Sequence, residues 1–535
     1  MPEEILLPAI VAIIGGLGAS ALRLPPLVGF LAAGFGLSTV GVEHVPGLSE
    51  VAEVGVAVLL FTIGLHLDVR MLTKVRIVGT AVGHAVANVL VYAGIFAILS
   101  FLPFAVFAHT GWTALLLVGL ASSFSSTVFV IALLEETGRA RSRVGQIAVG
   151  VLVLQDIFAV MFLVAASGHT PKPWAVALVA LPLVRPFMKK LPDRIYRVEL
   201  LVLSGVTIAI GAYALFELAG LSGTFGALVM GLVLSGHPVA GRLYEALTSV
   251  RELLLVGFFI EIGLGGLPNT AGFILAGVLL LLLPLKAAMF IGILYKLGMS
   301  RRTAILTAGA LANYSEFGLI VAALAVQRGM LSGTWVQIMA LAVAGSFVLS
   351  SVAKLKSGDF LDHFISILPS RDLAKLVPDE RPLSLAGYDV IILGMGRLGV
   401  GAYNQLTRAY HMKVAGIEHD EVRVQKMRAL GYSVFHGDAT DPDLWARVTA
   451  QSDGPRLLVL AMPDHFANLE ALSLLQSQGI NLVTAAIAKY DQRTRQLIDF
   501  GVDACVDLYS GAGTELADVA YRALHSDPKD LPLTE

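Results

Sequence analysis

An acidic residue in the middle of an apolar segment is the feature of this sequence best suited to chemistry. Asp156 lies near the centre of the apolar run from Gly145 to Gly168, which is long enough to cross a bilayer. An ionised carboxylate at that depth costs roughly 2.5–3.5 kcal/mol on insertion scales. Acids placed in this way mark ion or proton paths, so we expect Asp156 to bind a proton or a cation. The alternative is a protonated or paired acid that serves packing alone.

Polar residues interrupt two further apolar segments at mid-depth. One interruption is 122–127 and the other is 313–318, which contains a second buried acid, Glu316. The two segments run in opposite directions, which predicts an inverted repeat with two broken helices that cross at the centre. Broken helices place helix ends and bare carbonyls in the membrane, where they can hold ions. For Ser122 and Ser123, close helix packing is an equal alternative.

Further charged and polar residues lie within apolar segments. Lys286 either pairs with Asp156, competes with a cation as a positive charge, or forms a salt bridge that only holds the helices together. Glu261 faces a pore or lies near the external end of its segment. Four other polar residues are interpreted as packed rather than functional: His66, Asp68, His84 and Asn88.

Composition places these residues in an integral membrane protein. The 535 residues are 56% hydrophobic and 15% charged, with a mean hydropathy of +0.77. The net charge of -2 gives no support for a nucleic-acid partner, and the single cysteine excludes a disulfide framework. The acidic stretch from Met1 to Glu4 does not resemble a cleavable signal. Thirteen segments are predicted to span the bilayer: 4–22, 26–41, 49–67, 74–101, 111–134, 145–168, 173–187, 199–218, 222–236, 249–267, 272–296, 303–327 and 331–353.

Basic residues between these segments predict the topology. Alternate connections carry most of them, and the opposite side has only Lys172 and Arg328. Because basic residues stay in the cytoplasm, we expect the N-terminus outside and the C-terminal half in the cytosol. The basic connections contain Arg23; Arg70, Lys74 and Arg76; Arg139, Arg141 and Arg143; Arg185, Lys189, Lys190, Arg194 and Arg197; Arg242 and Arg251; Lys296, Arg301 and Arg302; Lys354 and Lys356.

The composition changes after residue 353. Residues 1–353 form the predicted transmembrane exchange domain, and 354–386 a linker. Phe360, Phe364, Ile365 and Leu368 suit an amphipathic helix at the membrane face. The linker either passes domain movement to the helices or is a passive tether. A nucleotide-binding domain is expected over 387–525, followed by a tail, 526–535.

A glycine-rich motif opens the C-terminal domain. The segment 394–399 reads GMGRLG and lies between a strand (389–393) and a helix (400–408), as a dinucleotide-binding Rossmann fold requires. Glu418 ends the next strand, at the distance from the motif where an acid would accept from ribose hydroxyls. That acid favours NAD(H) or another adenine nucleotide such as AMP over NADP. Further strands are expected at 433–436, 457–460, 482–487 and near Cys505, with a helix at 492–500. The predicted nucleotide-binding residues are Gly394, Gly396, Arg397, Leu398, Gly399, Glu418, Asp438, Ala439 and Met462.

This half lacks an acid, base or metal set for hydride chemistry, so we expect a regulatory nucleotide and no enzyme. A Rossmann fold that binds nothing is the alternative.

The order of parts resembles Kef-type antiporters of the monovalent cation:proton antiporter-2 family, which carry a C-terminal nucleotide-binding domain of the RCK or TrkA-N type. The resemblance covers nearly the whole chain. It rests on 59–68 (LLFTIGLHLD), Ser125-Ser126-Thr127, Gln155-Asp156, Gly257-Phe258-Phe259, Ser315-Glu316-Phe317, GMGRLG and 437–440 (GDAT). Gln-Asp is the more specific part, since electrogenic sodium/proton relatives usually carry Asp-Asp there.

The resemblance implies exchange of K+ for H+ by alternating access, in a homodimer in the bacterial inner membrane, with an ancillary regulatory subunit as a further expected partner. It implies that the helices of spans 3–6 and 10–12 move against a dimer scaffold. The expected ion site contains Asp156, Gln155, Ser126, Thr127, Lys286 and Glu316, with Asp156 the ligand of K+ or Na+. His66 and Glu261 depart from the family pattern. The stretch 485–489 lacks an arginine, so the sequence gives no support for gating by glutathione.

One carboxylate that holds either a proton or a cation predicts electroneutral exchange. Gln155 would add a neutral carbonyl oxygen, which suits a larger ion. A Na+/H+ antiporter is the nearest alternative, and a nucleotide-gated cation efflux channel is more distant. A potassium channel needs a carbonyl filter such as TVGYG, which this sequence lacks. A membrane-bound oxidoreductase is the last alternative.

Overall fold

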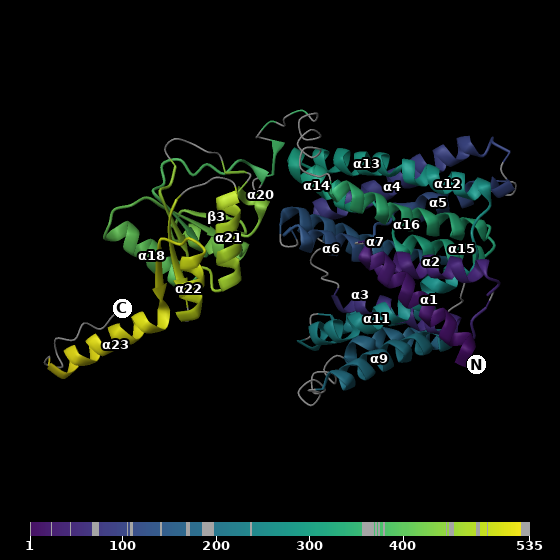
Figure 1. The fold of residues 1–535 in the computed structure, drawn as a ribbon, viewed down its shortest axis with the longest axis horizontal. Helices are drawn as coiled ribbons and strands as arrows, with labels where there is room; N and C mark the ends of the chain where they lie inside the picture. The colour runs from purple at the N-terminus through teal and green to yellow at the C-terminus, as the bar shows by residue number, and fades with distance from the viewer. Residues whose placement is uncertain are drawn as a thin grey trace. The chain divides into compact units, whose positions relative to one another are not determined.

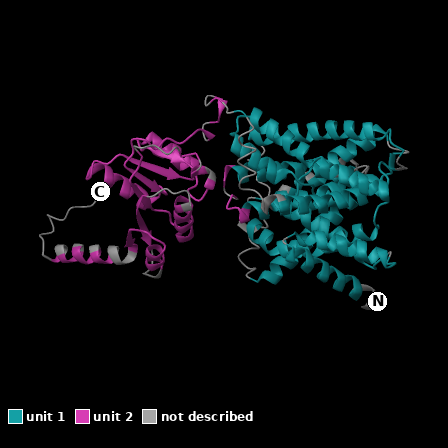
Figure 2. Cartoon of the chain, turned by 45° about the horizontal axis from the view of Figure 1, so that its top comes forward, with its two compact units in different colours: residues 1–134, 144–371 teal, residues 135–143, 372–535 magenta. Residues whose placement is uncertain are grey.

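The computed structural model divides the chain into two compact units. It describes residues 2–22, 24–42, 44–66, 74–103, 105–107, 111–139, 142–166, 172–184, 197–235, 238–355, 369, 372, 375–377, 380–445, 447–448, 454–477, 482–488 and 491–525. The helical unit contains residues 1–134 and 144–371, and the sheet unit contains 135–143 and 372–535 (Figure 2). Asp68 and the apolar linker residues Phe360, Phe364, Ile365 and Leu368 lie outside the described residues.

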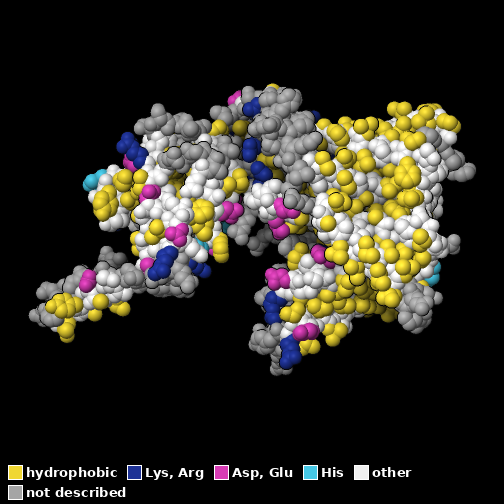
Figure 3. Space-filling view, viewed as in Figure 1, with side chains coloured by type: hydrophobic (Ala, Val, Ile, Leu, Met, Phe, Trp, Pro, Cys, Tyr) yellow, Lys and Arg dark blue, Asp and Glu magenta, His cyan; other side chains and the backbone are white. Residues whose placement is uncertain are grey.

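Helices form nearly all of the helical unit, and each predicted apolar segment coincides with helical structure. Among the described residues, seven helical segments are long and apolar enough to cross a membrane, or eight with a bent pair. Apolar side chains cover much of the face shown in Figure 3. The elements are α1 Pro2–Ala21, α2 Pro26–Thr39, α3 Leu48–His66, α4 Val75–Leu99, η2 Ala105–Phe107, α5 Trp112–Ser123, α6 Thr127–Glu136, α7 Arg143–Ala166, η3 Pro173–Val184, α9 Val198–Leu218, α10 Gly223–Leu234, α11 Pro238–Leu264, α12 Thr270–Leu281, α13 Leu283–Lys296, α14 Arg301–Leu311, α15 Glu316–Gln327 and α16 Thr334–Leu355.

Two of these elements differ from the sequence-based expectation. The seventh segment is a 3₁₀ helix, η3. Arg251 was placed in a connection, and that assignment was wrong, because α11 is continuous from Pro238 to Leu264. The first half of α11 is amphipathic rather than apolar throughout. Its buried Leu243 and Leu247 pack in a hydrophobic cluster with α3, α9 and α10, which extends the helix beyond the apolar window.

The helices of this unit pack as two bundles (Figure 1). In the scaffold bundle, α3 packs on α10 and α11, α2 on α1 and α11, and α9 on α10. Glycines allow close approach there: a Cβ on Gly231 would lie 2.2 Å from the Phe61 carbonyl oxygen. In the crossing bundle, α4 packs on α5 and α13, α14 on α13, and α16 on α12 and α15. The expected grouping of spans 3 and 10 with spans 4–6 is therefore wrong, because α3 and α11 belong to the scaffold bundle.

The two predicted helix interruptions are confirmed. The first break separates α5, which ends at Ser123, from α6, which begins at Thr127. The second separates α14, which ends at Leu311, from α15, which begins at Glu316, and the chain bends there by 48°. Polar side chains in both breaks bond to backbone groups, which is how non-helical backbone is tolerated inside a membrane protein.

A parallel sheet forms the centre of the second unit. Its strands are β1 Val390–Leu393, β2 Val414–Glu418, β3 Val434–His436, β4 Leu457–Leu460, β5 Val483–Ala488 and β6 Ala504–Asp507. Their order, β3-β2-β1-β4-β5-β6, is the doubly wound Rossmann order. The helices are α18 Arg397–Arg408, α19 Glu421–Ala429, α20 Pro442–Trp445, α21 His465–Ser477, α22 Asp491–Asp499 and α23 Leu508–His525. The predicted strands are confirmed, and so are the helices α18 and α22. The helices α19, α20, α21 and α23 were not predicted from the sequence.

Candidate functional site

Asp156 lies in the middle of α7, and its side chain is buried, with 3% of the residue exposed. Thr127 Oγ1 donates to Asp156 Oδ2 across 3.5 Å. Because Thr127 is the first residue of α6, the carboxylate lies near the N-terminal end of that half-helix. A helix N-terminus carries partial positive charge, which favours an anion beside it. The structure thus brings the two predicted residues together at the first break.

Glu316 occupies the position at the second break that Thr127 occupies at the first. It is the first residue of α15 and is 3% exposed. Ser315 Oγ donates to Glu316 Oε2 at 3.3 Å. The two breaks are in direct contact, because the Ser126 N–H donates to Asn313 Oδ1. Two buried acids therefore lie in one polar region: Asp156 lies beside the start of α6, and Glu316 is the first residue of α15.

Lys286 contacts the opposite ends of the broken helices. Its Nζ donates to the carbonyl oxygens of Ser122 at 3.0 Å, Phe124 at 2.8 Å and Asn313 at 2.7 Å. These carbonyls lie at the C-terminal ends of α5 and α14, where the helix dipole is negative. An ammonium has three N–H donors, so all of them are used by backbone. The geometry favours a structural role at the crossing over a direct pair with Asp156.

Amide side chains connect the two breaks. Gln155 Oε1 accepts from the backbone N–H of Ser125 at 3.0 Å, and Gln155 Nε2 donates to the Ser123 carbonyl at 3.1 Å. Asn313 Oδ1 accepts from the Ser126 N–H at 2.7 Å. The Ser125 hydroxyl donates to the Leu311 carbonyl at 2.8 Å. Gln155 thus spans the first break, while Asn313 and Ser125 join it to the second.

Sequence reasoning missed several members of this region. Asn313 and Ser125 lay inside the predicted interruptions but were not assigned to the site. Tyr314 has its ring centroid 5.0 Å from Lys286 Nζ, and its hydroxyl lies 3.1 Å from that of Tyr92. Sequence reasoning also missed a buried basic residue of the helical unit, Arg251 of α11, which is 9% exposed. Its burial was the missing signal, because a basic residue near a segment end is normally assigned to a loop.

The structure describes four further polar residues of the helical unit that the sequence analysis singled out. Glu261 is exposed on α11. His66 is the last residue of α3. His84 is fully buried and stacks on Phe290 with ring centroids 3.5 Å apart. Asn88 Nδ2 donates to the Gly119 carbonyl at 2.9 Å. Packing is thus the favoured interpretation of His84 and Asn88.

The glycine motif of the sheet unit has the geometry of a phosphate-binding turn. Gly394 has a φ of 90°, which only glycine adopts readily. A Cβ on Gly399 would lie 2.0 Å from the Gly394 carbonyl oxygen, so α18 packs closely on the turn. A Cβ built on Gly396 would meet no atom within 4 Å. Gly396 is the N-cap residue of α18, and no side chain caps this helix. The first N–H groups of α18, at Arg397 and Leu398, are therefore suited to an anionic ligand.

Glu418 lies beside this turn, as the sequence predicted. It is 3% exposed, and its Oε2 accepts from the Met395 N–H at 3.0 Å. Its Oε1 accepts from the N–H groups of His419 and Asp420 at 3.0 and 3.1 Å. The carboxylate is thus fixed at the end of β2. The backbone N–H of Arg423 lowers the pKa of Asp420, which begins α19.

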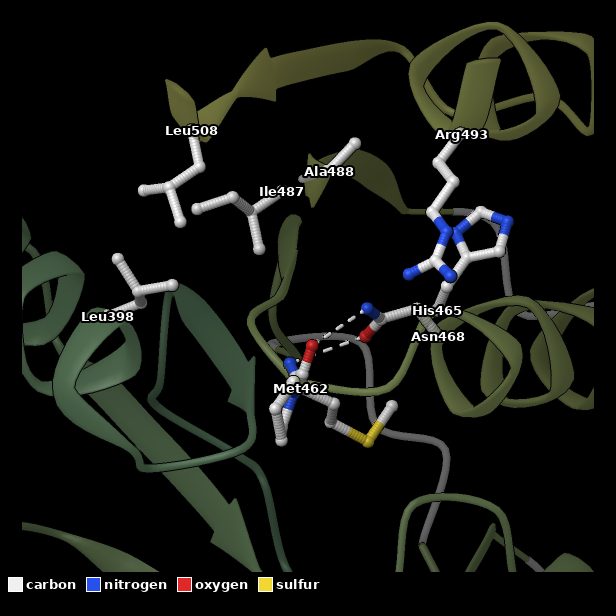
Figure 4. Close-up of a pocket in the computed structure, with 9 residues that line it drawn as sticks. Leu398, Met462, His465, Asn468, Ile487, Ala488, Arg493 and Leu508 are labelled. Carbon is white, nitrogen blue, oxygen red and sulfur yellow. Dashed lines mark hydrogen bonds between the residues drawn. The ribbon is translucent and has the colours of Figure 1, made fainter. Parts of the chain in front are cut away.

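The remaining predicted nucleotide-binding residues follow β3 and β4, the strands on either side of the β2–β1 pair. Asp438 follows β3, and its Oδ1 accepts from the Thr440 N–H at 2.9 Å. Ala439 is buried, and its carbonyl accepts from Trp445 Nε1 at 2.8 Å. Met462 follows β4 and lines a pocket beside Leu398 (Figure 4). His465 and Arg493, which sequence reasoning missed, also line that pocket. Ligands of doubly wound sheets bind at this switch point between β1 and β4.

The helical unit, with its two broken helices, and the Rossmann-type sheet unit define a transport protein with a nucleotide-binding-type domain. Residues 6–355 match the family model described as "Sodium/hydrogen exchanger, transmembrane", and residues 390–507 match the TrkA-N domain. The first match covers more than half of the chain, and the protein therefore belongs to the sodium/hydrogen exchanger family. It is a membrane protein with a cation/proton exchanger domain and a C-terminal TrkA-N domain.

Solved structures similar to each unit have low sequence identity. The sodium proton antiporter MjNhaP1 from Methanocaldococcus jannaschii is 14% identical, with 68% of this chain and 98% of that chain covered and a TM-score of 0.47. The NAD(P)-binding domain of an exopolyphosphatase-related protein from Archaeoglobus fulgidus is 18% identical (25% and 98% covered, TM-score 0.23). The TrkA-N domain of inner membrane protein ybaL from Escherichia coli is 19% identical (25% and 96% covered, TM-score 0.22).

Proposed function

We propose that this protein exchanges K+ for H+ across a bacterial inner membrane by alternating access, and that an adenine nucleotide on the TrkA-N domain regulates the exchange. The observation that carries the proposal is the pair of buried acids, Asp156 and Glu316. Glu316 begins the half-helix α15, and Asp156 of α7 contacts Thr127 at the start of the half-helix α6. The N-terminal ends of broken helices are places where a site can hold a cation or a proton.

Asp156 is the exchanging group in this proposal. Its carboxylate binds a cation when ionised and releases it when protonated, so one positive charge replaces another and transport is electroneutral. Thr127 donates to this carboxylate, and Ser126 precedes Thr127 in the same break. Both hydroxyl oxygens also supply neutral ligands for a weakly hydrated ion. The residue before Asp156 is the neutral Gln155, where electrogenic relatives usually carry a second aspartate, and this favours K+.

Gln155 and Lys286 position the site rather than bind the cation. Both polar atoms of the Gln155 amide bond to backbone across the first break. The ammonium of Lys286 bonds to three carbonyls. These contacts hold the two breaks together, so that the acids move as one body when the crossing bundle moves against the scaffold bundle. We place the N-terminus outside, the TrkA-N domain in the cytosol, and a second copy against the scaffold bundle.

The regulatory ligand in this proposal is NAD(H) or AMP. Glu418 lies at the end of β2 beside the glycine turn, which suits a ribose with free hydroxyls rather than a 2'-phosphate. Resemblance to the Kef-type branch supports regulation rather than catalysis by this domain. The nucleotide would change the exchange rate without being consumed.

Proton flux in proteoliposomes tests this function. Asp156→Asn should abolish K+-driven proton movement, because the amide cannot exchange a proton for a cation. Glu217→Gln is the matched acid-to-amide control, since Glu217 is exposed near the end of α9, and it should retain the wild-type rate. Normal exchange by Asp156→Asn would show that the site is wrong.

A Na+/H+ antiporter is the second candidate, because the matching family model is described as a sodium/hydrogen exchanger. Proton flux in the same proteoliposomes, measured once with K+ and once with Na+, decides between the two ions. If Na+ drives proton movement and K+ does not, the K+ assignment fails while the exchange mechanism stands.

A further inference from the structure

A pocket of the sheet unit lies on the side of β1 opposite to Glu418. Its lining includes Leu398 near the start of α18, Ile487 near the end of β5, and Leu508, the first residue of α23 (Figure 4). In the strand order β3-β2-β1-β4-β5-β6, β1 separates β2, which ends in Glu418, from β4 and β5. A nucleotide whose ribose contacts Glu418 therefore leaves this pocket unused unless it extends across β1.

A buried histidine of the pocket has an unpartnered ring nitrogen. His465 is 6% exposed, and its Nε2 lies 2.9 Å from Gln496 Oε1. Because an amide oxygen only accepts, Nε2 carries the proton of that bond, and Nδ1 of the neutral ring is then an acceptor. Nδ1 is buried and has no hydrogen-bond partner among the residues that the structure describes. Buried polar atoms are normally paired, so Nδ1 is suited to an N–H or O–H group of a ligand.

The rest of the lining combines one cation with apolar walls. Arg493 of α22 lies beside His465 (Figure 4), and a guanidinium suits a phosphate. Apolar side chains form most of the remaining lining, which suits the face of a planar ring. Asn468 already has a role, because its Nδ2 donates to the Met462 carbonyl at 3.0 Å and its Oδ1 accepts from the Met462 N–H at 3.3 Å. Asn468 thus holds the loop after β4, and His465 and Arg493 are the polar residues suited to a ligand.

The glycine turn connects this pocket to Glu418. Within the turn, the Met395 N–H donates to Glu418 Oε2 at 3.0 Å. On the other side, a Cβ built on Gly394 would lie 3.0 Å from the Cα of Met462, which lines the pocket. Phosphates bound at the first N–H groups of α18 would therefore lie between Glu418 and the pocket. A mononucleotide whose ribose contacts Glu418 ends at its phosphate, whereas a dinucleotide continues past it.

We propose that this pocket binds the second nucleoside of a dinucleotide, so that the regulatory ligand is NAD(H) rather than AMP. This rests on the proposed function, in which an adenine nucleotide binds at the glycine turn. Arg493 contacts the phosphate of the second nucleoside, whose ring lies against the apolar walls. His465 Nδ1 accepts a hydrogen bond from a hydroxyl or amide group of that nucleoside.

Calorimetric titration of the solubilised full-length protein with NADH and with AMP tests the pocket. Wild type should bind NADH at least about tenfold more tightly than AMP, which corresponds to about 1.4 kcal/mol. Leu508→Trp, which fills the pocket, should remove that advantage and leave the AMP affinity unchanged. Leu516→Trp is the matched control, because Leu516 is 70% exposed on the same helix, and it should keep the advantage.

Two further variants test the polar residues of the pocket. Arg493→Met and His465→Phe should each weaken NADH binding about tenfold without changing the AMP affinity. Arg495→Met, on an exposed position of the same helix as Arg493, should bind both ligands as wild type does. If His465 only served packing, His465→Phe would lower the unfolding temperature and weaken both ligands alike, which would contradict its assigned role.

The wild-type affinities separate this proposal from the proposed function. Equal affinities for AMP and NADH would overturn the dinucleotide assignment and leave regulation by an adenine nucleotide standing. Binding of neither ligand would overturn both. A full NADH advantage in Leu508→Trp would place the second nucleoside outside this pocket and would also overturn the assignment.

Discussion

The broken helices of the helical unit and the glycine turn of the sheet unit both contain helix ends that carry partial charge. Side chains balance that charge in the helical unit, whereas the glycine turn leaves it open to a ligand. In the helical unit, residues of the chain itself match the helix-end charges: Thr127 and Glu316 begin α6 and α15, and Lys286 contacts the carbonyls after α5 and α14. In the sheet unit, α18 begins at the glycine turn with no side-chain cap. The helix dipole is present in all of these places.

The difference follows from the solvent around each region. Inside a membrane protein, water is scarce and unsatisfied backbone groups are costly, so the chain must supply its own partners. At the surface of the sheet unit, water or an anionic ligand can bind the first N–H groups of a helix. A site for a small cation is therefore built from side chains, whereas a site for a nucleotide is left open by glycines.

The largest effect is expected at Lys286. Lys286→Met removes the donor from three buried carbonyls, and each unsatisfied group costs about 1–3 kcal/mol. We expect a marked fall in the thermal unfolding temperature of the detergent-solubilised protein, together with loss of exchange. Lys296→Met, at the exposed end of the same helix, is the control. An unchanged unfolding temperature in Lys286→Met would mean that other groups satisfy the helix ends.

A substitution in the glycine turn should weaken ligand binding without lowering the stability of the protein. In Gly396→Ala the new Cβ meets nothing within 4 Å, but it occupies the space that a phosphate would enter. We expect AMP and NADH to bind at least about tenfold more weakly by calorimetry, which corresponds to about 1.4 kcal/mol, with an unchanged unfolding temperature. Gly401→Ala, on the same helix and also unobstructed, should bind normally. Equal binding by the two variants would remove the glycine turn from the nucleotide site.

The smallest effect is expected at α19, a helix of the sheet unit whose N-terminus is closed by its own acid. Asp420 Oδ1 accepts from the N–H groups of Val422 and Arg423 at 2.9 and 3.2 Å. These bonds lower the pKa of Asp420 in the folded state. The stabilisation is therefore complete above the unfolded pKa, near about 3.9, and is lost as pH falls through the lower folded value. Asp420→Ala should melt slightly below wild type at neutral pH, and the difference should shrink in acid. A difference independent of pH would exclude the charge as its cause.

Local patterns in the sequence predicted much of the fold. The strand bounds followed from buried apolar runs between glycines and acids, and the helix breaks followed from polar residues in apolar segments. The contact between Asp156 and Thr127 agrees with the predicted ion site, which rested on polar residues in apolar segments and on the resemblance to Kef-type antiporters.

Contacts between distant segments were beyond sequence reasoning. The bonds of Gln155 and Lys286 to backbone depend on how the two breaks cross, which no local pattern records. Arg251 was missed because α11 begins in a mixed polar stretch. His465 and Arg493 meet Leu398 only because β4 and β5 follow β1 in the order of the sheet.

The pH dependence of cation affinity tests the central claim most directly. If Asp156 holds either a proton or a cation, the half-saturating K+ concentration in proteoliposomes should rise about tenfold for each unit of pH decrease where the acid is mostly protonated. The maximal rate at saturating K+ should stay the same. A half-saturating concentration that does not change with pH would show that the proton and the cation use separate sites, and would contradict the account.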